Sequence, residues 1–342
     1  MHLHDLRQHL RALGAKPCHE RLVLRAWTRA LPLDEGPCEA ADFLPARIRD
    51  AMPALTGAFA GVARVRSEHV AADASVRMLV DLADGQSVET VLLPRDGVCV
   101  STQAGCAVGC VFCMTGRSGL LRHLGSAEIV AQVALARARR PVHKVVFMGM
   151  GEPAHNLDAV LEAIDLLATE GDIGYKNLVL STVGDPRLFE RLPARRIRPA
   201  VALSLHSTFA ATRRALMPRA PQLDPEEIVD WGERYARATH YPIQYQWTLL
   251  RDVNDTGAEV DGIVRLLQGK YAVMNLIPFN AVEGAGHARP QEARALAMVA
   301  ALNRRGVLAK LRNSAGQDID AGCGQLRARS VERIAVRRDS LV

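Results

Sequence analysis

The sequence lacks the features that would place it in several large classes of protein. No apolar run in its 342 residues is long enough to cross a bilayer, and its charged, amphipathic start, MHLHDLRQHL, does not resemble a signal peptide. Its seven cysteines lack the paired spacing of a disulfide framework, and we find neither an internal repeat nor a low-complexity linker. These absences predict a cytoplasmic protein with no membrane partner, whose thiols stay reduced.

The charge of the chain is basic. It carries 43 Lys and Arg residues against 37 Asp and Glu, a formal net charge of +6, and arginine contributes most of the excess. A basic protein suits a polyanionic partner such as nucleic acid, although a solvated basic surface is the plainer explanation. The candidate phosphate contacts are Arg195, Arg196, Arg198, Arg213, Arg214, Arg327, Arg329, Arg333, Arg337 and Arg338.

The first 97 residues divide into two parts. Residues 1–55 are predicted to be helical, because Leu3, Leu6 and Leu10 recur at helical spacing. Residues 56–97 alternate between apolar and polar as strands do, with a hairpin turn between two of them. A helical domain followed by a small β segment is therefore expected.

From residue 98 to 326 the chain alternates between strands and helices in about six units. Ser126 and Asp224 are predicted N-caps of two of these helices. Such alternation predicts an α/β fold with a parallel sheet or barrel covered by helices. Ligands in these folds lie at the carboxyl ends of the strands. Residues 327–342 are expected to form a basic helix or tail.

The stretch from Cys99 to Gly119, CVSTQAGCAVGCVFCMTGRSG, contains four cysteines. Cys106, Cys110 and Cys113 lie four and three residues apart, so their sulfurs can converge on one inorganic centre. A structural zinc site is the alternative, but it needs a fourth ligand and no second Cys or His pair follows. The pattern Cys-x3-Cys-x2-Cys, with an aromatic residue before the last cysteine, resembles the radical S-adenosylmethionine (SAM) superfamily and favours a [4Fe–4S] cluster.

Short polar motifs follow several of the predicted strands. The motif Gly149-Met150-Gly151-Glu152-Pro153 offers bare backbone and one carboxylate to a ligand amine. Taken singly, each motif has a structural explanation, such as a helix cap, a turn or a satisfied polar side chain. Together they would line one mouth of a barrel, which favours a ligand site. The candidates are Gly151, Glu152, Ser181, Ser204, Leu205, His206 and Asn280.

The remaining three cysteines are of two kinds. Cys18 and Cys38 have no spaced partner and are interpreted as plain thiols. Cys323 lies between two glycines in the segment DIDAGCGQL, far from the other cysteines in sequence. It either fills space in the core or, as the flanking glycines favour, is a reactive thiol on an exposed, mobile loop.

With these motifs in view, the chain resembles the radical-SAM RNA methyltransferases that methylate an adenine of 23S rRNA, the adenine-C2 family and its C8-methylating relatives. The shared motifs run in order through nearly the whole chain: LRALGAKP, VETVLLP, the cysteine loop, GMGEP, STVG, LSLH, DVND, NLIPFN and DIDAGCGQL. The resemblance implies a partial (β/α)6 barrel with an N-terminal helical accessory domain that binds RNA.

The resemblance also implies roles for the candidate residues. The cluster ligands would be Cys106, Cys110 and Cys113, and the polar residues at the strand ends would line the SAM site. Cys323 would carry the methyl group, Cys99 would resolve the adduct as a disulfide, and Glu89 would accept the ring proton. Without the resemblance, Glu89 would be interpreted as an exposed carboxylate on a strand.

The implied reaction uses two molecules of SAM per turnover, because an electron-poor ring carbon cannot attack a methyl group as an amine does. One SAM methylates Cys323, and a radical derived from the second takes hydrogen from that methyl. The resulting carbon radical adds to C2, or less readily C8, of the adenine. The implied partners are rRNA, possibly also tRNA, and a reducing donor such as flavodoxin, and the protein is expected to be a monomer.

The chain departs from the family pattern at a few positions, among them Gln246, Arg251, Ala315 and Gln317. None is expected to touch the cluster or the cysteine pair, so they bear on the RNA target rather than on the reaction. Two other hypotheses remain: a radical-SAM enzyme acting on a small molecule or peptide, and a non-catalytic RNA-binding protein with a structural metal site.

Overall fold

The computed structural model describes residues 1–36, 38–117, 119–282 and 284–328. Most of the basic tail expected at 327–342 lies outside these residues, and only its first two positions are described. Within the described ranges, the helices are too short or too polar for any of them to cross a membrane.

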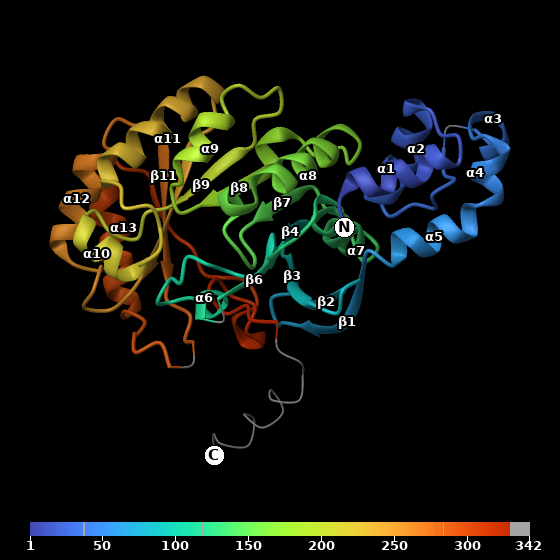
Figure 1. Ribbon diagram of the computed structural model, residues 1–342. Coiled ribbons are helices and arrows are strands. Elements are labelled where there is room, and N and C mark those ends of the chain that lie inside the picture. The colour runs from blue at the N-terminus through green and yellow to red at the C-terminus, as the bar shows by residue number, and fades with distance from the viewer. Residues whose placement is uncertain (37, 118, 283, 329–342) are drawn as a thin grey trace, which may run out of the picture.

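The N-terminal helices form a lobe at one side of the molecule (Figure 1). Residues 1–55 are largely helical as expected, and the last of these helices continues to Ala60. The buried positions of the first helix are Leu3, Leu6 and Leu10, so the leucine spacing places one face in the core. The helices are α1 (Leu3–Ala12), α2 (Pro17–Thr28), α3 (Ala40–Phe43), α4 (Ala46–Asp50) and α5 (Met52–Ala60).

This lobe is docked on two barrel helices, α7 (Ser126–Arg137) and α8 (Leu157–Thr169). The Leu3 amide donates to Ser126 Oγ over 2.9 Å, and Arg25 pairs with Glu170 at the end of α8. The prediction that Ser126 caps α7 is wrong: Gly125 is the N-cap, and the Ser126 hydroxyl instead joins the lobe to the barrel. Because the lobe and barrel share one apolar cluster, removing residues 1–55 would expose core.

The described strands form one large sheet and one small one. In the large sheet β1 (Ala63–Val70), β2 (Val76–Leu82) and β3 (Ser87–Leu93) are antiparallel, and β3 joins β4 (Gly97–Cys99) with Val91 opposite Cys99. The β segment is therefore continuous with the barrel sheet. Parallel strands follow: β7 (Lys144–Phe147), β8 (Leu178–Thr182), β9 (Ala200–Ser204), β10 (Ile243–Leu249), β11 (Ala272–Pro278) and β12 (Ala309–Leu311).

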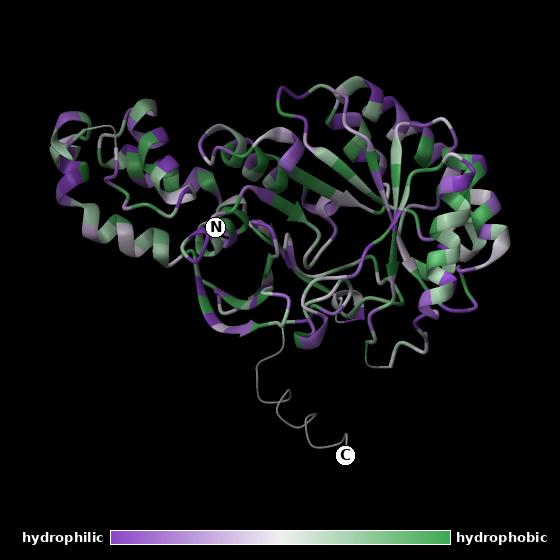
Figure 2. Ribbon diagram, turned by 180° about the vertical axis from the view of Figure 1, so that it is seen from behind, coloured by the Kyte–Doolittle hydropathy of each residue, from purple (hydrophilic) through white to green (hydrophobic). Residues whose placement is uncertain are grey.

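The parallel part of the sheet, from β4 to β12, is a partial barrel, as expected, because the whole sheet has β1 and β12 as its edges and these two strands do not pair with each other. Its inner face carries small apolar residues in register, among them Val146, Val179 and Ala200. These side chains leave space inside the barrel. The helices lie outside, with polar faces toward solvent (Figure 2).

Helices connect the parallel strands in chain order. Asp224 caps α11 (Pro225–Thr239) as predicted, since its carboxylate accepts from the Glu226 amide over 2.9 Å. The other covering helices are α9 (Pro186–Arg191), α10 (Ala210–Leu216), α12 (Gly257–Leu267) and α13 (Glu292–Arg304). The cysteine loop contains β5 (Gln103–Gly105), α6 (Met114–Arg117) and β6 (Leu120–His123), and β5 pairs with β6. Short 3₁₀ turns complete the fold: η1 (Pro153–Asn156), η2 (Tyr175–Asn177) and η3 (Gln317–Ile319).

Candidate active site

One cavity collects the cysteine loop and the ends of the first parallel strands. Cys106, Cys110 and Cys113 line it together with residues at the carboxyl ends of β7, β8 and β9. These residues are Gly151, Glu152, Ser181, Ser204 and His206. The strand order β7-β8-β9 places their carboxyl ends side by side, so residues distant in sequence meet at one mouth.

The cysteine loop closes tightly because of its glycines. Gly105 and Gly109 have φ of +80° and +68°, a region that side chains other than glycine rarely adopt. A Cβ on Gly116 would lie 2.9 Å from the Gly109 Cα, so α6 packs directly against the loop backbone. Burial raises the pKa of the Cys106 thiol to about 12 and that of Cys110 well above its usual value. A positively charged centre is therefore needed to hold these sulfurs as thiolates.

The donor set fits an iron–sulfur cube better than a single zinc ion. Among the described residues, no three His, Cys, Asp or Glu side chains are gathered closely enough to hold one metal ion. A cube spreads its thiolate ligands over several iron atoms, so three thiols around a shared cavity suit it. The chemistry and placement of Cys106, Cys110 and Cys113 therefore fit a [4Fe–4S] cluster.

Glu152 places a buried carboxylate in the same cavity. Its oxygens accept from the amides of Ala154 and Val183, each over 3.1 Å, and its own amide donates to Gln103. Burial raises the pKa of Glu152 to about 7, although its hydrogen bonds to the two amides favour the charged form. A ligand ammonium beside the carboxylate would favour the charged form further. The neighbouring Gly151 has φ +108° and its Cβ would lie 2.7 Å from that of Gln103, so only glycine fits there.

His206 contributes a neutral ring to the cavity. Its Nδ1 accepts from the Thr248 amide over 2.9 Å, and burial lowers the pKa of the ring to about 3. The ring meets the edge of Phe112, with 4.7 Å between centroids. The His206 ring therefore carries no positive charge, and it places a flat polar side chain beside the cysteine loop.

Two of the expected SAM-site residues do not line this cavity. Leu205 is fully buried, and its amide donates to the Gln246 carbonyl on β10. The Asn280 amide nitrogen donates to Ser314 Oγ over 2.8 Å and to the Cys323 carbonyl over 3.0 Å. The Asn280 Oδ1 atom is buried without a partner among the described residues, so it remains available to a ligand. In this structure Asn280 positions the Cys323 turn.

The Cys323 turn is exposed, as expected, but it is not a loose loop. Met114 donates its amide to the Gly324 carbonyl over 2.7 Å, and the Thr115 hydroxyl donates to the Leu326 carbonyl over 2.6 Å. A Cβ on Gly324 would lie 2.8 Å from the Phe112 carbonyl oxygen. The glycine is thus required for close packing on the cysteine loop.

A second cavity, of about 580 Å³, begins where the first ends. Cys323 lines both cavities, and Cys99 lines the second one only. Burial raises the pKa of the Cys99 thiol to about 12, and the charge of Cys323 adds to that shift. The two cysteines, 224 positions apart in the numbering, therefore share one space. All seven cysteines are free thiols in this structure.

Sequence reasoning missed three cations that line the second cavity: Arg95, Lys144 and Arg312. They lie at the ends of different strands, and nothing in their local sequence marks them as neighbours. Two departures from the family pattern also line the cavities, Gln246 the first and Ala315 the second. These two positions therefore belong to the walls of the cavities, while no contact of either with the cluster cysteines or the Cys99–Cys323 pair is seen among the described residues.

Glu89 is buried, so its interpretation as an exposed strand carboxylate is wrong. Arg77 lies 3.2 Å from one of its oxygens, and the Arg327 amide donates to the other over 2.6 Å. Burial raises the pKa of Glu89, although Arg77 opposes the shift. Glu89 does not line either cavity, but Val91, two residues along the same face of β3, lines the second.

The arginines expected to contact phosphate do not form one patch. Arg213 is buried and donates to the Val183 carbonyl, so it cannot contact RNA, and burial lowers its pKa to about 10. Arg195 pairs with Asp165, whereas Arg196 is exposed. Arg195 and Arg196 precede β9, whereas Arg214 follows it, so Arg214 lies at the opposite end of the barrel from the other two. Arg329, Arg333, Arg337 and Arg338 lie outside the described residues.

Comparison with known proteins agrees with this geometry. The model of the radical SAM superfamily matches residues 100–260, which contain the cysteine loop and the strand ends around the first cavity. A radical SAM methyltransferase from Sphaerobacter thermophilus superposes with a TM-score of 0.82 at 33% identity, over 96% of this chain and 98% of that one. The fold and the site therefore define a radical SAM protein.

Curated relatives narrow the family further. A probable RNA methyltransferase of Aromatoleum aromaticum is 69% identical over 97% of this chain and 93% of its own length. A probable RNA methyltransferase of Stutzerimonas stutzeri is 65% identical over 99% of both chains. The chain belongs to the radical SAM superfamily and, within it, to the family that these proteins form.

The cysteine assignment predicts the metal content. Protein purified and reconstituted without oxygen should be brown and contain about four irons per chain. Replacing Cys106, Cys110 and Cys113 by serine should abolish the iron and the colour. Cys18→Ala, at an exposed cysteine remote from the loop in sequence, is the matched control and should keep both. Stoichiometric zinc in the reconstituted wild type would contradict the assignment.

Proposed function

We propose that this protein is a radical-SAM methyltransferase that methylates a ring carbon of an adenine in RNA, C2 rather than C8. The observation that carries the proposal is the position of Cys323, which lines both cavities. One cavity holds the residues expected to bind the cluster and SAM, and the other holds Cys99. A thiol at their junction suits a methyl carrier. The names of the relatives support RNA as the substrate.

In this proposal the first cavity binds the cofactors. The three cysteines would hold the cluster, and Glu152 would face the ammonium of SAM. The orphaned Asn280 Oδ1 is a further acceptor beside the Cys323 turn. The cluster and SAM together supply hydrogen abstraction by a radical. Two SAM molecules per turnover follow, since one methyl is placed on Cys323 and one molecule is spent on abstraction.

The second cavity would hold the adenine while the thiols of Cys323 and Cys99 react. The Cys323 sulfur carries the methyl carbon, which adds as a radical to the adenine ring. The resulting adduct must then lose one electron, for which the cluster would be the acceptor, and the ring proton, so that Cys323 is left bonded to the adenine through that carbon. The Cys99 sulfur then attacks the Cys323 sulfur, so a disulfide forms and the bond between Cys323 sulfur and carbon breaks. The electron pair of that bond passes to the carbon, which takes a proton and becomes the methyl group of the product. The resemblance gives Glu89 as the acceptor of the ring proton, although in this structure Glu89 pairs with Arg77 and lines neither cavity.

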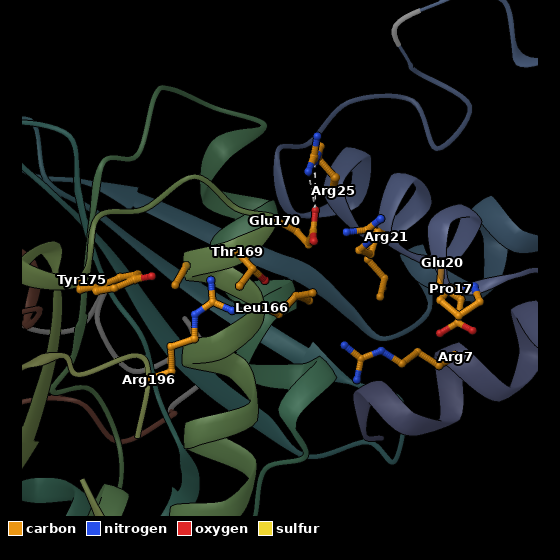
Figure 3. A pocket seen from close by; sticks show the side chains of 12 residues that line it. Arg7, Pro17, Glu20, Arg21, Arg25, Leu166, Thr169, Glu170, Tyr175 and Arg196 are labelled. Atoms are coloured by element: carbon orange, nitrogen blue, oxygen red, sulfur yellow. Dashed lines mark hydrogen bonds and ion pairs between the residues drawn. The ribbon is translucent and has the colours of Figure 1, made fainter. Parts of the chain in front are cut away.

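A cleft between the N-terminal lobe and the barrel supports RNA as the partner. It encloses about 630 Å³ and lies at the end of the barrel remote from the cysteine loop, beside the end of α8 and the start of η2. Figure 3 shows Arg21 reaching in from the lobe and Arg196 from the barrel. Neither pairs with a carboxylate among the described residues. Tyr175, 37% exposed, adds a ring on which a base can stack.

The cleft yields a prediction about RNA binding. The double variant Arg21→Gln/Arg196→Gln should weaken RNA binding and lower its salt dependence by about 1.4 in the slope of log K against log salt, since each phosphate contact in single strands contributes about 0.7. The matched control, Arg234→Gln/Arg304→Gln, removes the same charge from exposed helix positions. Fluorescence anisotropy measures both. Equal salt slopes for the two double variants would show that the cleft does not bind RNA.

The cysteine pair gives the sharpest test of the proposed function. Cys99→Ala should still attack RNA through Cys323 and then stall, because no second thiol releases the product. It should be isolated with RNA attached, seen as a band on a denaturing gel that disappears on ribonuclease treatment. Cys323→Ala should carry no RNA.

Two packed thiols without a chemical role predict another outcome. Both variants would then lose a little stability and behave alike, and neither would carry RNA. Recovery of Cys99→Ala free of RNA, with the methylation activity of the wild type, would therefore overturn the assignment. Cys38→Ala, at an exposed cysteine, controls for the loss of a thiol.

A further inference from the structure

We propose that Arg95, Lys144 and Arg312, here called the cation triad, bind a backbone phosphate of the nucleotide whose base lies beside Cys323. The inference deepens the proposed function and rests on it, because it assigns the second cavity to one nucleotide of an RNA chain. All three side chains line that cavity together with Cys99 and Cys323.

The triad is assembled by the fold from three separate elements. Arg95 precedes β4, and Lys144 begins β7, whose first residue pairs with Gly97 of β4. Arg312 follows β12, the strand at the other edge of the sheet. Because the barrel does not close, cations from its first and last parallel strands line the same space.

The electrostatics of the triad favour the binding of an anion. Partial burial lowers the pKa of Lys144, and the charges of Arg312 and Arg95 lower it further. Like charges repel, so an arrangement of this kind is stabilised by a bound negative group. No carboxylate pairs with any of the three side chains within the described ranges.

Asp73 is the one carboxylate among the described residues lining this cavity. Its oxygens accept from the amides of Ser75 and Gly316, each over 3.0 Å, so it fastens the loop after β12 to the β1–β2 turn. The Asp73 carboxylate thus makes its hydrogen bonds to backbone amides and does not pair with the cation triad. The cavity therefore keeps an excess of positive charge.

The shape of the site favours a nucleotide over other anions. A cavity of about 580 Å³ admits a base with its sugar and phosphate but not a folded acidic protein. The carboxylate of SAM is expected in the first cavity, which the triad does not line. Arg312 also lowers the pKa of the buried Cys99 thiol, so its charge reaches the proposed reacting sulfur. A phosphate on the triad would place its own base near both cysteines.

The test uses the full-length protein, reconstituted with its cluster, and short fluorescent oligoadenylate as the probe. Arg95→Gln and Lys144→Gln should each weaken binding about threefold to tenfold at low salt and lower the salt slope by about 0.7. The double variant should lower the slope by about 1.4. Arg312 is left intact because of its proximity to Cys99. The matched control, Lys270→Gln/Arg304→Gln, should bind as the wild type does.

Turnover provides a second readout. With total RNA from a strain lacking the gene as substrate, the double variant should show a raised KM and an unchanged kcat. Methylation of Cys323 by SAM, which needs no RNA, should be unaffected. A slope and a KM equal to those of the wild type would overturn the inference while leaving the proposed function intact.

Two further outcomes separate the inference from its rivals. If the double variant keeps RNA binding but loses SAM cleavage driven by reduced flavodoxin, and keeps cleavage driven by dithionite, the triad binds an acidic electron donor and the inference is wrong. If the wild type methylates no RNA while oligoadenylate binding still depends on the triad, the proposed function fails and the phosphate site stands.

Discussion

The packing of the Cys323 turn on the cysteine loop is the contact on which the site depends. The amide of Met114 and the hydroxyl of Thr115 hold the carbonyls of Gly324 and Leu326, and the bare Cα of Gly324 lies against the Phe112 carbonyl. These contacts join the first and last parts of an open barrel. They set the Cys323 thiol between the two cavities that we propose for the cofactors and for the substrate.

The open edge of the barrel explains the second cavity. A closed sheet would pair β12 with the opposite edge and fill the space between them, whereas here that space is lined by Cys99 and the cation triad. The N-terminal lobe docks on the outside of the barrel, where the Leu3 amide donates to Ser126 and Arg25 pairs with Glu170. The same lobe forms a basic cleft with the barrel, so the features suited to RNA lie on two sides of a single scaffold.

Much of the fold could be predicted from the sequence, because local patterns specify helices, strands and the Asp224 cap. The convergence of Cys106, Cys110 and Cys113 with Glu152 and His206 could also be predicted, since parallel strands bring their ends together. The burial of Arg213 and of Glu89 could not, because it depends on partners 30 and 238 positions away. For the same reason, no local signal marks Lys144 and Arg312 as neighbours, and the firm packing of the Cys323 turn shows only in the folded chain.

The central claim is that Cys323 carries the methyl group between the two cavities. Peptide mass spectrometry of the reconstituted enzyme after incubation with SAM tests it most directly. We expect one methyl group on the peptide containing Cys323 and none on the peptide containing Cys99. It also predicts that this methyl disappears as RNA is methylated under reducing conditions. Methylation of RNA by an enzyme whose Cys323 is never methylated would contradict the account.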